Sequence, residues 1–208
     1  MGPARNRTGR PTREEAPLLA RKIVDIATEM FIASGYSGTT MEKLARAAGV
    51  SKKTIYARYA DKEALFRDVV RQMARPSIRE GLAGDDTLTL EQGLRQRARL
   101  IMAATLEPRS MAFYRLIQRE VAQFPELGKV IESQNIAELY DPLTEYFRSW
   151  KDNGELRDVE PEWAAKLFVY LVFGDLNSRL LMAAGPPSDH ETEEYLDRVC
   201  GIFLRGIP

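Results

Sequence analysis

Cysteine and histidine are almost absent from this 208-residue sequence, which contains one of each, Cys200 and His190. A single cysteine excludes an internal disulfide framework and fits a reducing compartment, so we expect a cytoplasmic protein. Two such residues cannot supply a Cys/His ligand set for zinc, and we predict no metal site and no cofactor. We interpret Cys200 as a small buried hydrophobe, with a sensor thiol as the alternative, and His190 as a solvated surface residue.

Long hydrophobic runs and catalytic groupings are also missing. The most apolar stretch, 163–173, is too short to cross a membrane and contains Lys166. The basic N-terminus is not followed by the apolar segment of a signal peptide. No glycine-rich phosphate loop follows a strand, and no nucleophile is grouped with a base. We therefore predict neither membrane association nor enzymatic activity, and no catalytic residues.

The charges are balanced overall but unevenly distributed along the chain. Residues 1–81 contain 16 Lys or Arg and 9 Asp or Glu, a net charge of +7. Residues 82–208 contain 14 Lys or Arg and 21 Asp or Glu, a net charge of −7. A basic N-terminal third beside an acidic remainder suits a head that binds a polyanion, with chance asymmetry as the alternative.

Residues 40–66 contain two short helical patterns separated by a tight turn. Leu44, Ala45 and Ala48 form one apolar face of the first helix. Gly49 can adopt the left-handed conformation that ends this helix, and Ser51 is a suitable N-cap for the next one. Two helices joined at an angle by a short glycine turn are typical of a helix-turn-helix, whose second helix enters the major groove of DNA.

The start of the second helix carries the cations, hydroxyl and tyrosine that such a motif presents to DNA. We expect these side chains nearest the base edges or the flanking backbone. Thr40, Arg58 and Lys62 are expected to hold phosphates. The predicted DNA-contacting residues are Thr40, Ser51, Lys52, Lys53, Thr54, Tyr56, Arg58 and Lys62.

Apolar residues recur at helical spacing along most of the chain, and no stretch alternates as a strand would. We predict an all-α fold of about nine helices. A disordered basic arm at 1–16, either a plain tail or a DNA contact, would precede a three-helix head at 17–80. A loop at 81–87 would begin a helical body at 81–208. The body helices are expected at 89–106, 110–122, 126–152 with a kink near 138–142, 161–183 and from 188 onward.

The motif resembles that of the TetR family of transcriptional repressors over about residues 18–75. The family shares a Thr, a Leu-Ala pair, an Ala-Gly-Val-Ser turn, Thr-Ile/Leu-Tyr, an aromatic residue and Lys-Glu-x-Leu. Arg58 departs from it, since many relatives carry His there, as does Tyr59, where Phe is commoner. The resemblance implies a dimeric repressor that a small, often apolar effector releases from operator DNA. The matching residues are Thr40, Leu44-Ala45, Ala48-Gly49-Val50-Ser51, Thr54-Ile55-Tyr56, Tyr59 and Lys62-Glu63-Ala64-Leu65.

Aromatic and apolar residues between 100 and 182, interspersed with a few polar ones, are candidates for the effector cavity that this resemblance implies. Plain core packing is the alternative for each of them. The candidate effector-binding residues are Met102, Thr105, Phe113, Tyr114, Ile117, Gln134, Trp150, Trp163, Tyr170, Phe173 and Asn177.

The helix expected at 161–183 is apolar nearly all round, which indicates burial on every side. In a small body, this pattern implies core packing on one side and a second copy of the chain on the other. We predict a four-helix interface formed with the helix that starts at 188. The candidate dimer contacts are Leu171, Val172, Leu196, Val199 and Phe203.

Together these features predict a DNA-binding transcriptional regulator, specifically a homodimeric repressor that a small, largely apolar effector releases from a palindromic operator. Its partners would be double-stranded operator DNA, the small-molecule effector and a second copy of the chain, with no membrane partner. The alternative is a helical dimeric protein-interaction module without DNA binding, whose basic head would contact an acidic protein.

Overall fold

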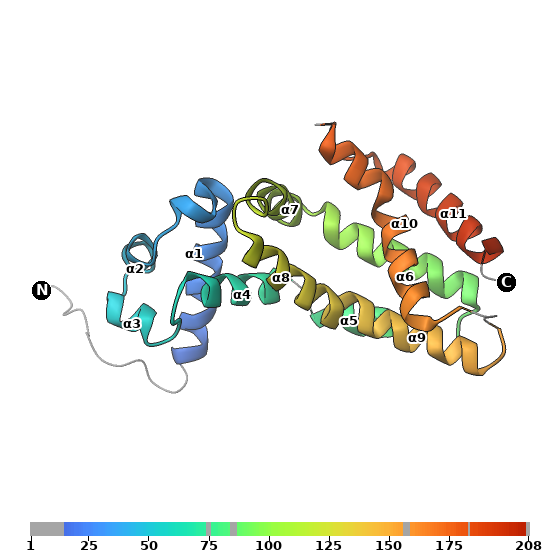
Figure 1. Ribbon diagram of the computed structural model, residues 1–208, viewed down its shortest axis with the longest axis horizontal. Helices are drawn as coiled ribbons and strands as arrows, with labels where there is room; N and C mark the ends of the chain where they lie inside the picture. The colour runs from blue at the N-terminus through green and yellow to red at the C-terminus, as the bar shows by residue number, and fades with distance from the viewer. Residues whose placement is uncertain (1–14, 74–75, 84–86, 156–158, 183, 207–208) are drawn as a thin grey trace, which may run out of the picture. The chain divides into compact units, whose positions relative to one another are not determined.

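The computed structural model describes residues 15–73, 76–83, 87–155, 159–182 and 184–206 (Figure 1). All regular elements in these ranges are helices, which confirms the predicted all-α class. Within the same ranges, no helix has the length and apolar character needed to cross a bilayer. The chain divides into two compact units, Met1–Val69 and Val70–Pro208. The predicted arm lies outside the described residues up to residue 14, and the first helix already begins at Glu15.

The first unit is built around three aromatic rings. Phe31, Tyr36 and Phe66 lie with their ring centroids 5.4–5.7 Å apart, and all three side chains are buried. Gly35 has a φ of 74° and introduces a kink into the first helix. The helices of this unit are α1 (Glu15–Gly38), α2 (Met41–Ala48), α3 (Lys52–Tyr56) and the first part of α4 (Lys62–Met73).

The second unit contains the remaining helices, and α6 (Leu90–Leu106) and α11 (Asp189–Gly206) run side by side in it (Figure 1). Phe147, Phe168 and Phe203 pack together in its core with ring centroids 5.3–6.1 Å apart. These three rings join α9, α10 and α11. The elements are α5 (Pro76–Ala83), α6 (Leu90–Leu106), α7 (Pro108–Glu120), α8 (Pro125–Asn135), the π-helical η1 (Ile136–Tyr140), α9 (Asp141–Asp152), α10 (Pro161–Leu181) and α11 (Asp189–Gly206).

The loop predicted at 81–87 is wrong over residues 81–83, which form the last turn of α5. Leu82 is fully buried, and its carbonyl oxygen accepts a hydrogen bond of 2.9 Å from Nε of the buried Arg97. This tertiary contact stabilises helical backbone that glycine and the following acidic residues disfavour locally. The division into two compact units falls between Val69 and Val70, within α4, and the predicted boundary at residue 80 stays a prediction.

The kink predicted near 138–142 is confirmed and takes the form of a π-helical segment between α8 and α9. Pro142 has no N–H to donate, and its ring would clash with the carbonyl of residue 138 in a regular α-helix. The backbone widens instead, and the N–H of Asp141 donates to the carbonyl oxygen of Ile136, five residues earlier. Segments of this kind often occur at functional sites.

Candidate nucleic-acid interface and ligand cavity

The turn between α2 and α3 is set by local hydrogen bonds. Gly49 adopts the left-handed conformation (φ 70°, ψ 32°), and the N–H of Val50 donates to the carbonyl of Ala45 at 3.0 Å. The ammonium of Lys22 in α1 donates to the last carbonyl of α2, that of Ala48, at 3.2 Å. A cation at a helix C-terminus is favourable for the helix dipole, so this bond also secures α2 against α1.

Burial on one side of the motif decides which side faces solvent. Leu44 and Ala48 of α2 are buried, as predicted, and Ile55 of α3 is fully buried beneath them. The opposite side of α3 therefore exposes Lys53 and Tyr56, whose side chain is 47% exposed. An exposed cation and aromatic phenol on a helix held in this way are suited to contacts in a nucleic-acid groove.

The hydroxyl groups at the start of α3 serve as caps. Ser51 Oγ accepts a hydrogen bond of 3.1 Å from the N–H of Thr54, and the two hydroxyl oxygens lie 2.8 Å apart. Thr40 caps α2 in the same way, accepting from the N–H of Lys43 at 3.2 Å. These three predicted contacts thus have defined structural roles in the free protein. Cap hydroxyls at the surface can still approach phosphates, so their DNA role stays a prediction.

Three of the predicted DNA-contacting cations have different surroundings. Lys52 forms an exposed ion pair with Glu42 at 2.9 Å, and this contact lowers the pKa of the Glu42 carboxyl. Arg58 is exposed beside the buried Tyr59. Lys62 lies at the start of α4 and is partly buried; its Nζ donates to the carbonyl oxygen of Tyr36 at 2.8 Å. The eight predicted residues thus lie at the start of α2, within and beside α3, and at the start of α4, and their contacts with DNA stay a prediction.

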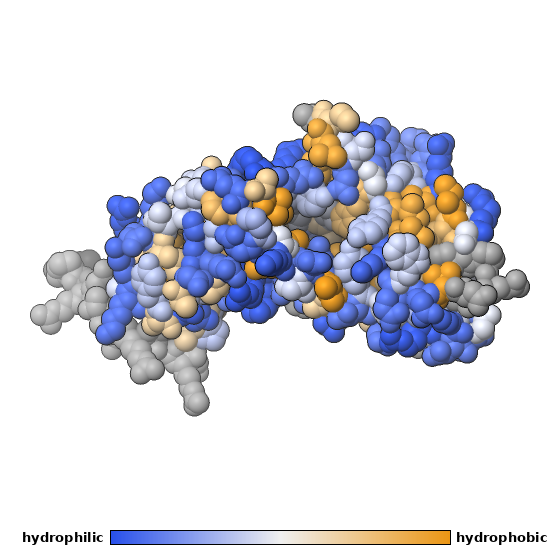
Figure 2. Space-filling model, viewed as in Figure 1, coloured by the Kyte–Doolittle hydropathy of each residue, from blue (hydrophilic) through white to orange (hydrophobic). Residues whose placement is uncertain are grey.

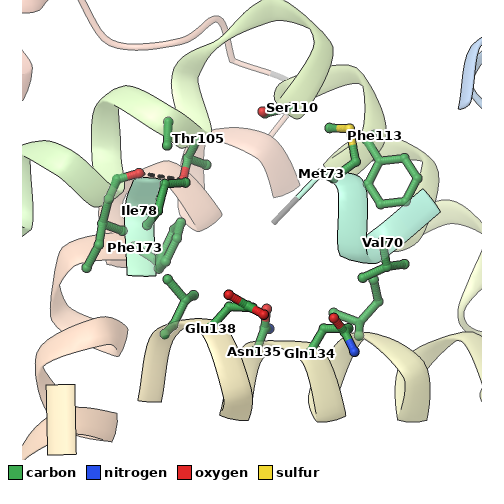
Figure 3. Close-up of a pocket in the computed structure, with 14 residues that line it drawn as sticks. Val70, Met73, Ile78, Thr105, Ser110, Phe113, Gln134, Asn135, Glu138 and Phe173 are labelled. Atoms are coloured by element: carbon green, nitrogen blue, oxygen red, sulfur yellow. Dashed lines mark hydrogen bonds between the residues drawn. The ribbon is translucent and has the colours of Figure 1, made fainter. Parts of the chain in front are cut away.

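A cavity of about 180 Å³ lies within the second unit (Figure 3). Most of its wall is apolar, and five of the lining residues have polar side chains. Gln134, Asn135 and Glu138 lie along one wall at the junction of α8 and η1. The complete lining is Val70, Met73, Ile78, Ile101, Ala104, Thr105, Ser110, Phe113, Ile131, Gln134, Asn135, Glu138, Leu139 and Phe173.

Four of the predicted effector-binding residues line this cavity: Thr105, Phe113, Gln134 and Phe173. The other candidates lie elsewhere, because the apolar side of each helix packs against the core and against other helices as well as the cavity. Met102 is buried in the core, Trp150 packs against the ring of Tyr146, and the hydroxyl of Tyr114 donates to Oδ1 of Asn177. Trp163 and Tyr170 are 58% and 60% exposed. Ile117 is also absent from the lining.

Sequence reasoning missed the carboxylate of this cavity, Glu138. The spacing of Ile131, Gln134 and Glu138 is i, i+3 and i+7, which places all three on one face of a helix. This pattern could have identified Glu138, since Gln134 was already a candidate. Val70, Met73 and Ile78 could not have been identified in this way, because only the packing of α4 and α5 brings these residues to the cavity.

The predicted dimer contacts need a correction. Val172, Leu196, Val199 and Phe203 are between 0% and 5% exposed, because they form the core of the second unit within one chain. They cannot also be the surface that a second copy covers. Leu171 is partly buried, and its carbonyl accepts from the hydroxyl of Tyr195. The large apolar side chains that α10, its C-cap and α11 do expose are Trp163, Tyr170, Leu181, Met182 and Ile202.

The chemistry of the remaining candidate residues is unremarkable for this fold. Cys200 is fully buried, and burial raises the pKa of its thiol, as expected for a small core side chain. His190 is exposed in the first turn of α11. Among the residues that the structure describes, no three His, Cys, Asp or Glu side chains come together as metal ligands would.

Both units match known sequence families. Residues 23–69 match bacterial regulatory proteins of the tetR family, and residues 92–206 match the C-terminal domain of AefR-like transcriptional repressors. The chain belongs to the TetR family. It is therefore a DNA-binding transcriptional regulator with a helix-turn-helix and not an enzyme, which confirms both predictions.

Individual TetR-family relatives extend over most of the chain. The HTH-type transcriptional repressor Rv1474c of Mycobacterium tuberculosis is 28% identical over 170 residues, covering 80% of this chain and 84% of the relative. A solved TetR-family regulator from Mesorhizobium loti is 29% identical, with a TM-score of 0.76, covering 94% of this chain and 98% of that one. The flavonoid-responsive regulator FrrA is 27% identical, with a TM-score of 0.76, covering 91% and 97%.

Proposed function

We propose that the protein is a homodimeric repressor that binds a palindromic operator and leaves it when a small, largely apolar effector enters the cavity. The α3 helices of the two protomers would enter successive major grooves, about 34 Å apart. Such a regulator acts where the chromosome lies, so we infer a cytoplasmic protein.

The continuity of α4 carries this proposal. Its first residue, Lys62, donates to the carbonyl of Tyr36 in the DNA-binding unit, and its last residues, Val70 and Met73, line the cavity. A ligand that changes the packing of Val70 and Met73 acts directly on the helix that begins in the head. It would shift the population between a form that fits the operator and one that does not.

The proposed DNA contacts form two groups according to their position in the fold. Lys53 and Tyr56 are exposed on α3 and would contact base edges, with Lys52, Ser51 and Thr54 beside them at the helix start. The remaining residues lie at the starts of α2 and α4 and after α3, where a helix-turn-helix meets the phosphate backbone. These proposed phosphate contacts are Thr40, Arg58 and Lys62.

The apolar lining supports an effector that is mostly hydrocarbon or aromatic. Phe113, Phe173 and Met73 provide aromatic and thioether surface, which binds such ligands without a large desolvation cost. FrrA, a relative of similar fold, responds to flavonoids, which are also aromatic. This likeness favours an aromatic skeleton.

The exposed apolar residues of α10 and α11 support a dimer. Tyr170 and Leu181 are 60% and 75% exposed, and Ile202 of α11 is 58% exposed. Figure 2 shows apolar surface in the region of α10 and α11 and at the C-terminal end of α10. Clusters of this kind commonly mark protein interfaces, so a second copy would cover these side chains rather than the buried residues predicted first.

A binding experiment separates this proposal from a protein-interaction module. Fluorescence anisotropy would measure binding of the full chain to DNA from upstream of its own gene and to a scrambled duplex, each at two salt concentrations. The proposal expects tighter binding to the upstream DNA and a loss of affinity with salt, because phosphate contacts release counterions. No preference for any duplex, together with capture of an acidic protein, would instead support the interaction module.

A further inference from the structure

The cavity has one ionisable side chain among the described residues that line it, Glu138. We propose that the cavity binds a small organic cation, an arylalkyl amine whose ammonium group contacts the Glu138 carboxylate and whose apolar part packs in the remaining space. This inference rests on the proposed function, because it names the ligand class of the effector cavity.

The position of Glu138 is the first argument. Its carboxylate points into the cavity from η1, beside the carboxamides of Asn135 and Gln134 (Figure 3). The residue is partly buried, and the facing walls include Phe113 and Phe173. An ionised carboxylate beside apolar walls loses hydration, and a ligand cation is the partner that offsets this cost.

The surroundings of Glu138 within the chain are the second argument. Among the described residues, no Lys or Arg is ion-paired with it. Arg79 of α5 donates to the backbone carbonyl of Ala137, the residue before Glu138, at 3.1 Å. Within the described part of the chain, this carboxylate thus has no ion-pair partner of its own.

Hydrogen-bonding capacity is the third argument. An ionised carboxylate only accepts hydrogen bonds. The hydroxyl of Thr105 donates its proton to the carbonyl of Ile101 at 2.8 Å. Its oxygen can therefore only accept a hydrogen bond from a ligand, as the carboxylate does. An ammonium group has three donors and no acceptor, which complements this arrangement. A carboxylate ligand would meet the charge of Glu138 and, among the described lining residues, would find amide and hydroxyl donors but no cation.

The test uses ligands that share a skeleton and differ in charge. Calorimetric titration of the full chain, without DNA, would compare 4-phenylbutylamine, 4-phenylbutanol and 4-phenylbutanoic acid, and the corresponding trios from phenylethyl to phenylhexyl. We expect at least one amine to bind roughly tenfold or more tightly than its alcohol, as a charge-assisted hydrogen bond provides, and the acids to bind weakest. An alcohol or acid that equals its amine throughout, or no binding by any amine, overturns the proposal.

Two variants locate the effect. Glu138→Gln keeps the size of the side chain and removes its charge, so the advantage of the amine over the alcohol should disappear while alcohol binding persists. Glu132→Gln removes an exposed charge from the same wall helix, α8, without altering the lining, and should keep the advantage. Persistence of the advantage in Glu138→Gln would overturn the assignment; circular dichroism and a thermal melt would verify that both variants fold.

Operator release is measured separately, so the two proposals can fail separately. Amine binding without release of operator DNA would support the cation site and contradict the effector role. Release by neutral aromatic compounds, with no amine binding, would support the repressor mechanism and overturn the cation site.

Discussion

The ammonium of Lys62 lies 4.1 Å from the centre of the Tyr36 ring and donates to the carbonyl oxygen of the same residue at 2.8 Å. Tyr36 in turn packs against Phe31 and Phe66 in the core of the head. Lys62, a predicted phosphate contact, thus also holds the start of α4 against the end of α1. Both roles can be tested with one substitution.

Lys62→Ala should lower the free energy of unfolding by about 1.5–3 kcal/mol, the usual range for a hydrogen bond that involves a charged group. It should also weaken binding to operator and random DNA alike, and reduce the slope of log K against log salt concentration by about one unit. The matched control is Arg67→Ala, which removes one charge from the same helix where Arg67 pairs with Glu63. An unchanged salt slope in Lys62→Ala would leave Lys62 with a structural role alone.

Lys53→Ala and Tyr56→Ala should each reduce operator affinity more than random-sequence affinity. The expected difference is about 1–3 kcal/mol per lost base contact, because both side chains are exposed on the side of α3 that is proposed to face the groove. Anisotropy titrations with both duplexes measure it. Tyr56→Phe serves as the control that separates the ring from the hydroxyl. If operator and random DNA lose affinity equally, the two residues contact the backbone only.

Phe203→Asp and Tyr170→Asp should have different consequences, although both residues lie on the helices proposed to form the dimer. Phe203 is 3% exposed between Phe147 and Phe168, so a buried charge there should unfold the second unit. Tyr170 is 60% exposed, so Tyr170→Asp combined with Leu181→Asp should give a folded monomer with weaker operator binding. Sedimentation velocity and thermal melting distinguish the two. A dimeric Tyr170/Leu181 double variant would move the interface elsewhere.

Gly93→Ala should lower stability even though alanine favours helices. A Cβ at this position in α6 would lie 2.3 Å from the hydroxyl oxygen of Tyr146 and 2.9 Å from a guanidinium nitrogen of the fully buried Arg97. Overpacking of a core usually costs about 1–3 kcal/mol, which exceeds the stabilisation expected from the higher helix propensity of alanine.

The matched control for Gly93→Ala is Gly201→Ala in α11, where the nearest atoms lie at 3.8 Å. This change should be neutral or stabilise by up to about 1 kcal/mol. Chemical denaturation of both variants measures the difference. Equal stability of the two would show that Tyr146 and Arg97 can move aside at little cost.

The helix-turn-helix could be predicted from the sequence because its geometry depends on neighbouring residues. Gly49 ends α2, Ser51 caps α3 through a bond to Thr54, and Asp61 caps α4 by accepting from the N–H of Ala64 at 2.7 Å. Each contact spans only a few residues, so the pattern contains the information. The same holds for the kink at Pro142, because the missing N–H of that residue acts on its own helical turn.

Only the tertiary structure decided which side of each body helix faces the core. An apolar stripe indicates burial without naming the neighbour, so Val172 and Phe203 could be assigned to a dimer surface while they lie in the core. The cavity combines residues from six helices and η1, and Val70, Met73 and Ile78 reach it only through the packing of α4 and α5. Contacts between residues far apart in the chain set these positions, and no local pattern encodes them.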